Sequence, residues 1–306
     1  MTSRDGAFDR EPAGSLTDAI VAYYDETWLD YRLLWLNRRN LAVHFGYADA
    51  STRGHTDELI NMNRVLAERV AIRPGEHVLD AGCGVGGSSL WLARERSVDV
   101  VGITPVASQV ALARRFAARR GLADRVRFQQ ADYAAVPFAD ASFDVVWALE
   151  SLCHAPRKEA FYREAARLLR PGGRVIIAEY IRTARPLDSG NERLLHEWLD
   201  GWAIPDIDAA TEHRANLAGT GFADARLVDV TAHTRPSLRR LHRLAASTYP
   251  LAVMGRSLRI RSVVQHRNVI GSLRQYRALE RGAWFYGIIS AVKPTAGETR
   301  TRGGQQ

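Results

Sequence analysis

The stretch from residue 77 to 95 constrains this chain more than any other. An apolar run ends in Asp80, a turn with glycines at positions 82, 84, 86 and 87 follows, and an apolar-periodic segment begins at Leu90. This order predicts a strand, a tight turn and a helix, with glycines that allow positive φ and a close approach of the backbone to a ligand. The free N–H groups at the start of the helix favour a carboxylate or a phosphate. We therefore expect a small-molecule site at this turn.

The spacing of the glycines narrows the choice of ligand. It reads Gly82-x-Gly84-x-Gly86 with an acid two residues earlier, although Gly82, Gly84 and Gly87 also fit the looser spacing of dinucleotide sites. No Gly-Lys-Ser/Thr follows, which excludes a P-loop. The stretch DAGCGVGGSS resembles the first motif of class I S-adenosylmethionine (SAM) methyltransferases, and it is closer still to their sterol and γ-tocopherol C-methyltransferase branch. The resemblance, over about residues 70–182 and loosely over the flanks, implies SAM as cofactor, with S-adenosylhomocysteine as product.

The segments after the glycine turn predict an α/β fold. Strand-like runs alternate with helical runs, which indicates a parallel, doubly wound sheet that binds ligands at the carboxyl ends of its strands. The resemblance implies a Rossmann-like sheet of seven strands, mostly parallel, with an antiparallel last strand. We expect strands at 77–81, 98–104, 126–130, 143–149, 174–180, 225–233 and 283–294, and helices at 56–71, 87–95, 106–120, 156–170, 191–202, 210–221 and 236–281.

The chain length allows one large domain with insertions or a cap. Tyr23-Tyr24-Asp25 matches a segment that lies over the SAM site in the resembled branch, so we expect a cap there; ordinary helix packing is the alternative. The expected segments are a disordered tail at 1–15, a helical N-terminal cap at 16–72, a SAM-binding core at 73–182, a helical cap and connection at 183–224, closing strands with a helical lid at 225–294, and a tail at 295–306.

The lid segment is strongly basic. Residues 235–281 contain eleven arginines, no lysine and a single acid, Glu280, within a chain of net charge +8. Such a segment could meet an anionic substrate, nucleic acid or an acidic membrane surface, or it could be a solvated helical face. Cys83 and Cys153 are the only cysteines, the N-terminus lacks a secretory signal, and no apolar run reaches about 18 residues. We expect a cytoplasmic protein with reduced thiols and no membrane span.

Each part of SAM needs its own partner. Asp80 suits the ammonium group, although it could merely cap the next helix, and the N–H groups that follow Gly82 and Gly84 suit the carboxylate. The second strand ends in Thr104 with no acid, which departs from the general class I pattern, agrees with the resembled branch and argues against NAD. The resemblance assigns ribose contacts to Thr104 and Gln109 and adenine contacts to the third strand end. The expected cofactor-binding residues are Asp80, Gly82, Cys83, Gly84, Thr104, Gln109, Asp132, Tyr133, Ala148 and Tyr24.

The loop after the fourth strand is the candidate catalytic loop. The sequence WALESLCH resembles the corresponding MESGEHMP loop of sterol methyltransferases, with Glu150 and His154 in the positions of its Glu and His. Either residue could move a proton, and histidine titrates near neutrality; a purely structural histidine is the alternative. No metal signature is present, because the remaining histidines lack ligand spacing.

The favoured acceptor is an apolar terpenoid or prenylated natural product, methylated on an alkene carbon. Such a reaction passes through a carbocation, which aromatic faces stabilise and which could also cyclise. We expect Tyr23, Trp28, Trp198 and Trp202 to contact the acceptor. The overall sequence also resembles actinobacterial enzymes of teleocidin-type pathways. The alternatives are O- or N-methylation of a metabolite, an RNA-binding methyltransferase suggested by the basic lid, and a SAM-binding protein without chemistry. We expect a homo-oligomer, no nucleic-acid partner, and Mg²⁺ only if the acceptor carries a diphosphate.

Overall fold

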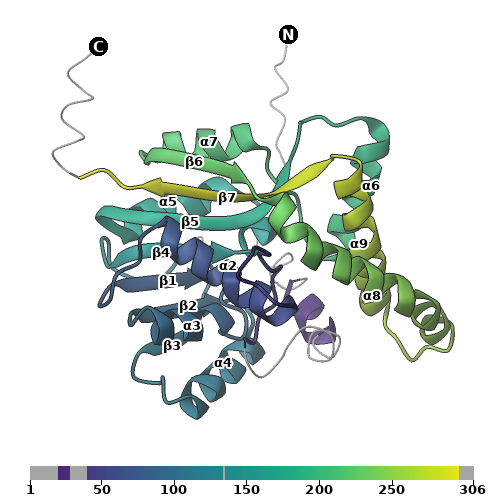
Figure 1. The fold of residues 1–306 in the computed structure, drawn as a ribbon, viewed down its shortest axis with the longest axis horizontal. Helices are drawn as coiled ribbons and strands as arrows, with labels where there is room; N and C mark the ends of the chain where they lie inside the picture. Colours follow the sequence, from purple (N-terminus) through teal and green to yellow (C-terminus); the bar gives the residue numbers. More distant parts are fainter. Residues whose placement is uncertain (1–19, 28–39, 134, 296–306) are drawn as a thin grey trace, which may run out of the picture.

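The computed structural model describes residues 20–27, 40–133 and 135–295. A seven-stranded sheet with the order β3-β2-β1-β4-β5-β7-β6 forms its centre, and helices cover both faces (Figure 1). Five neighbouring strands are parallel, whereas β7 is antiparallel to both β5 and β6. The predicted fold class, with its antiparallel last strand, is confirmed.

The elements follow the predicted order. The strands are β1 (His77–Ala81), β2 (Asp99–Thr104), β3 (Val126–Gln130), β4 (Phe143–Leu149), β5 (Leu169–Arg182), β6 (Ala223–Asp229) and β7 (Trp284–Val292). The helices are α2 (His55–Arg69), α3 (Gly87–Glu95), α4 (Ala107–Arg119), α5 (Lys158–Leu168), α6 (Ser189–Gly201), α7 (Ala210–Gly219), α8 (Thr231–Ser257) and α9 (Val263–Glu280), with a 3₁₀ turn η1 (Leu152–His154).

The central strands are apolar on both faces because both faces are covered. Val78 of β1 belongs to one core cluster and Leu79 to the other, and Val145 and Val146 of β4 divide in the same way. Alternating side chains of a strand point to opposite faces, so a strand buried on both sides reads as a continuous apolar run. Because β1 and β4 pair in parallel, their carboxyl ends lie side by side.

Three boundaries differ from the prediction. Helix α5 ends at Leu168, and β5 already begins at Leu169, so Pro171-Gly172-Gly173 lies within the strand rather than before it. Gly172 has φ +79° and donates its N–H to the Lys293 carbonyl at 2.7 Å, which ties this bend to the end of β7. Strand β6 ends at Asp229, because residues from Thr231 onward continue as α8. The helical part of the basic segment therefore begins earlier than predicted and is divided into α8 and α9.

The α8–α9 hairpin is inserted between β6 and β7 and projects from the body of the molecule, where α9 packs along α6 (Figure 1). The described residues of the expected N-terminal cap are 20–27, which are helical, and 40–72, which include α2. The predicted tail at 1–15 and Trp28 lie outside the described residues, as do residues beyond Thr295. Within the described ranges, no helix is long and apolar enough to cross a membrane.

Candidate active site

The glycine turn between β1 and α3 is tightly built. Gly82, Gly84 and Gly86 have φ values of +93°, +53° and +86°. A Cβ on Gly82 would lie 2.2 Å from the Ser151 Cβ, whereas one on Gly84 would meet nothing within 4 Å. The turn therefore contacts the catalytic loop at its first glycine and is open at its second.

Two neighbouring backbone N–H groups of this turn are already bonded within the protein. Those of Gly82 and Cys83 both donate to the Ile103 carbonyl at 2.9 Å. This corrects the expectation that the Cys83 N–H binds the cofactor carboxylate, because it is already bonded within the fold. The open side at Gly84 is where a ligand can approach the backbone.

Asp80 is the last residue but one of β1, just before the turn. Its side chain is only 2 % exposed and accepts a hydrogen bond from the Ser89 Oγ at 2.5 Å. Burial raises the pKa of Asp80 to about 6, against the hydrogen bonds from Ser89. No basic side chain of the described residues forms an ion pair with it. A buried carboxylate without a cation fits an ammonium group, which would compensate the cost of its charge.

The next two strand ends carry the expected ribose and adenine residues. Thr104 donates its hydroxyl to the Gln109 Oε1 at 2.8 Å, which fixes that amide and leaves its nitrogen as a donor. Asp132 is exposed just after β3. Tyr133 donates its hydroxyl to the Ser151 carbonyl at 3.2 Å. Ala148 lies within β4, and its side chain is buried in a core cluster.

Glu150 begins the candidate catalytic loop with φ +49°, a strained conformation for a residue with a Cβ. Its Oε1 accepts from the Phe45 N–H and the Tyr286 hydroxyl, both at 2.7 Å, and its Oε2 accepts from the Tyr180 hydroxyl. Burial raises its pKa to about 7, although all three hydrogen bonds oppose the rise. Its charge is therefore poised near neutral pH.

His154 lies one turn further along the same loop. Its Nδ1 is 3.2 Å from the Ala203 carbonyl, and its Nε2 is 3.1 Å from the Tyr24 hydroxyl. A carbonyl only accepts, so Nδ1 carries the hydrogen and Nε2 accepts from Tyr24. Burial lowers the pKa of His154 to about 4. At neutral pH the ring is neutral, with its free electron pair directed to Tyr24.

A mostly apolar cavity of about 290 Å³ opens beside Glu150 and His154. Its walls come from the N-terminal segment, the candidate catalytic loop, the end of β5 and the α8–α9 hairpin. The lining residues include Tyr23, Tyr24, His44, Phe45, Glu150, His154, Tyr180, Trp202, Ile204, Leu241, Leu244, Leu251, Arg261, Asn268 and Val269.

Three of the four predicted acceptor residues can be placed. Tyr23 and Trp202 line the cavity, and Tyr23 also donates its hydroxyl to the Asn268 Oδ1 at 2.8 Å. Trp198 is 0 % exposed and lies behind the wall, with its ring edge-on to Tyr180 at 5.2 Å between centroids. Direct contact of Trp198 with the acceptor is therefore a wrong expectation, because its helical periodicity reflects core packing.

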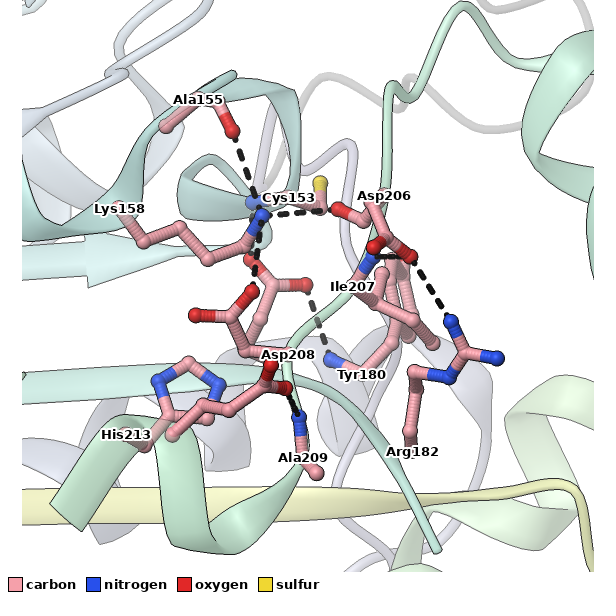
Figure 2. Close-up of polar contacts among 12 residues, drawn as sticks. Cys153, Ala155, Lys158, Tyr180, Arg182, Asp206, Ile207, Asp208, Ala209 and His213 are labelled. Carbon is pink, nitrogen blue, oxygen red and sulfur yellow. Dashed lines mark hydrogen bonds and ion pairs between the residues drawn. The ribbon is translucent and has the colours of Figure 1, made fainter. Parts of the chain in front are cut away.

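A buried polar cluster supports the catalytic loop from behind (Figure 2). The ammonium group of Lys158, a residue only 4 % exposed, donates to the carbonyls of Ala155 at 3.2 Å and Asp206 at 2.8 Å. It also lies 3.7 Å from the Asp208 carboxylate. Lys158 thus joins the end of the loop that carries His154 to the segment whose Ala203 carbonyl orients that histidine.

Sequence reasoning missed the partners of Glu150. Tyr180 and Tyr286 are direct cross-strand partners of β5 and β7, and their hydroxyls meet on one carboxylate. Tyr180 stood at a predicted strand end, which was the available signal. Phe45 lies outside the expected strands and helices, and no local sequence pattern indicated a role for Lys158. Among the described residues, no group of three His, Cys, Asp or Glu side chains is placed to hold a metal ion.

The sheet order, the glycine turn and the loop opposite it define the class I methyltransferase fold. A model of the methyltransferase domain family matches residues 79–177, from β1 into β5. The 27-O-demethylrifamycin SV methyltransferase of Amycolatopsis mediterranei is 32 % identical over 254 residues, which is 82 % of this chain and 90 % of that protein. Methyltransferase GfsG of Streptomyces halstedii is 35 % identical over 230 residues, 73 % of this chain and 81 % of that protein.

The chain therefore belongs to the SAM-dependent methyltransferase family, and SAM is its cofactor. The predicted relation to sterol enzymes has a counterpart in the sterol 24-C-methyltransferase of Eremothecium gossypii, 31 % identical over 229 residues, 71 % of this chain and 59 % of that protein. Among solved structures, the [4+2]-cyclase SpnF superposes with a TM-score of 0.75 at 26 % identity and covers 92 % of this chain and 97 % of its own.

Proposed function

We propose that this enzyme transfers the SAM methyl group to a hydroxyl oxygen of a small apolar molecule of specialised metabolism. The observation that carries the proposal is the His154 Nε2, an unprotonated nitrogen held against the Tyr24 hydroxyl at the wall of an apolar cavity. Oxygen methylation needs a base and an oriented hydroxyl. The same choice is supported by the 27-O-demethylrifamycin SV methyltransferase, whose name describes an O-demethylated substrate and 90 % of whose length matches this chain.

The cofactor half of the site is assigned to the strand ends. Asp80 would hold the ammonium group, the open backbone at Gly84 the carboxylate, Thr104 and Gln109 the ribose, and Asp132 with Tyr133 the adenine edge, as the sequence predicts. Ser151 contacts both the turn at Gly82 and, through its carbonyl, Tyr133. The cofactor pocket and the catalytic loop are thus tied together.

When bound at these residues, SAM would supply an electrophilic methyl group, with S-adenosylhomocysteine as the product. Tyr24 would accept a hydrogen bond from the acceptor hydroxyl. The proton of that hydroxyl would move to the Tyr24 oxygen as Tyr24 passes its own proton to the His154 Nε2. The Ala203 carbonyl holds the Nδ1–H and stabilises the imidazolium that forms. The apolar walls exclude water, which strengthens these interactions.

His154→Gln tests this base. We expect kcat to fall by about 10²–10⁴-fold, with SAM affinity measured by calorimetry unchanged. The matched control is His233→Gln, because His233 also faces a backbone carbonyl, that of Ala48 at 2.9 Å, but does not line the cavity. Turnover by His154→Gln equal to that of the control would refute the assignment.

Methylation of an alkene carbon is the second candidate, favoured by the aromatic rings of Phe45, Tyr180 and Trp202 around the cavity and by the nearby Glu150 carboxylate. These groups suit a carbocation, from which a base then removes a proton. Methyl-¹³C-labelled SAM distinguishes the two. After incubation with hydroxylated macrolides, phenols and prenylated indoles, an O-methyl resonance supports the first proposal and a C-methyl resonance the second. Conversion without S-adenosylhomocysteine would indicate a catalyst that only binds SAM.

A further inference from the structure

Exposed apolar side chains are concentrated at one place on the described part of the chain. Of the eight large hydrophobic residues that are exposed there, seven lie within residues 249–263, at the end of α8, in the turn and at the start of α9. Leu258 and Ile260 are 61 % and 76 % exposed. The seven residues, which we name the hairpin tip, are Tyr249, Leu251, Val253, Met254, Leu258, Ile260 and Val263.

The hairpin tip is also positively charged. Arg256 and Arg259 are exposed between its apolar residues, and Arg261 is half-buried beside them. No acid occurs in the sequence between Asp229 and Glu280. The acid found beside these arginines is Glu26, from the N-terminal segment. Clustered arginines interleaved with exposed apolar side chains are typical of segments that lie at the surface of an anionic membrane.

The hairpin tip is continuous with the acceptor cavity. Leu251 belongs to the tip and lines the cavity as well, and Ala252 and Arg261 line it from the same segment. The hairpin projects from the body of the molecule, so its end can meet a flat surface without obstruction by the sheet (Figure 1). An apolar acceptor dissolved in a membrane could therefore reach the cavity along this surface.

We propose that the hairpin tip docks on an anionic lipid surface. The apolar side chains enter the boundary between headgroups and acyl chains, while the arginines bind the anionic headgroups. A second copy of this chain fits less well, because a two-fold contact would bring identical arginine clusters together. A folded acidic protein would satisfy the arginines but would need a groove for this projecting tip. The proposal is independent of which atom is methylated.

Sedimentation with vesicles tests the proposal without any turnover. We expect the protein to bind vesicles of phosphatidylcholine with phosphatidylglycerol, to bind phosphatidylcholine alone much more weakly, and to be released by salt. The variant Arg256→Gln/Arg259→Gln should bind about 25-fold more weakly, since each arginine near the surface contributes about 5-fold. Leu258→Ser/Ile260→Ser should also lose binding. These side chains are exposed, so thermal melting should show both variants folded.

The matched control is Arg226→Gln/Val228→Ser, because both residues are exposed on the edge strand β6, outside the hairpin tip. It should bind vesicles as the wild type does. Absence of vesicle binding by the wild type, equal binding to both lipid compositions, or equal losses in the control would overturn the proposal. Light scattering that shows a dimer dissociated by Leu258→Ser/Ile260→Ser would also overturn it, in favour of a second copy. Salt-sensitive capture of an acidic protein without vesicle binding would do the same.

Discussion

The replacement Glu150→Gln isolates the cost of a buried charge next to the reacting groups. Glutamine has nearly the same shape, and its oxygen can accept from the Phe45 N–H and the Tyr286 hydroxyl as the Glu150 Oε1 does. Its nitrogen can donate to the Tyr180 hydroxyl, which is able to accept. The variant therefore keeps the two hydrogen bonds to its oxygen, reverses the direction of the third and loses the ability to ionise.

The magnitude follows from the pKa of Glu150. Burial raises it from 4.5 to about 7. Each pKa unit is worth ~1.4 kcal/mol, so full ionisation costs the folded state about 3 kcal/mol. The folded protein holds this proton more tightly than the unfolded chain. The stabilisation is therefore fully present below pH 4.5 and is lost as the pH rises through 7.

Urea denaturation of wild type and Glu150→Gln from pH 4.5 to 8.5 measures this linkage. We expect the unfolding free energy of the variant, minus that of the wild type, to increase by about 3 kcal/mol over this range. Glu164→Gln is the control, because hydrogen bonds from Arg167 lower the pKa of Glu164. Its difference should be constant above pH 5. A flat difference for Glu150→Gln would refute the buried-charge reasoning.

Three further predictions concern the support of the site. Gly82→Ala should weaken SAM binding in calorimetry by about 10–100-fold, because the new Cβ would lie 2.2 Å from the Ser151 Cβ at a residue with positive φ. Gly219→Ala is the control and should leave SAM binding unchanged, because nothing lies within 4 Å of a Cβ at that position. Lys158→Met should lower the unfolding free energy by about 2–4 kcal/mol, since two carbonyls lose their donor; an unchanged value would contradict its clamping role. Trp198→Ala should lower the unfolding free energy by about 3–5 kcal/mol in the same denaturation assay, because it leaves a cavity in the core. A loss under about 1 kcal/mol would contradict the placement of Trp198 in the core.

Local sequence signals predicted the cofactor half of the site. Asp80, Thr104 and Asp132 each lie within two residues of the end of a strand, and parallel strands bring such ends to one edge of the sheet. The loop from Glu150 to His154 was found in the same way. Their roles toward SAM stay predictions, as do the homo-oligomer, the cytoplasmic location and the teleocidin-type relation.

Local patterns failed where tertiary pairing decided the structure. Pro171-Gly172-Gly173 is a strong helix stop, and α5 does end before it, but the segment then joins β5 because Gly172 and Gly173 bond to Lys293 at the far end of the sheet. Trp198 has the spacing of an amphipathic helix, which cannot distinguish a core residue from one that lines a cavity. Lys158 offers no pattern, because its buried partners are backbone carbonyls.

The two halves of the site differ in predictability because they differ in how the chain builds them. The residues predicted to bind SAM lie within a few positions of one strand end after another, so a short motif specifies each expected contact. The cavity is closed instead by residues such as Tyr24, Phe45, Tyr180 and Leu241, which come from segments far apart in the chain. The register of β5 against β7, the α8–α9 insertion and the segments that precede β1 together bring them to one cavity. A methyltransferase core can therefore keep one cofactor motif while its insertion and N-terminal segment change the acceptor. For this reason the cofactor could be predicted from the sequence, whereas the acceptor must be measured.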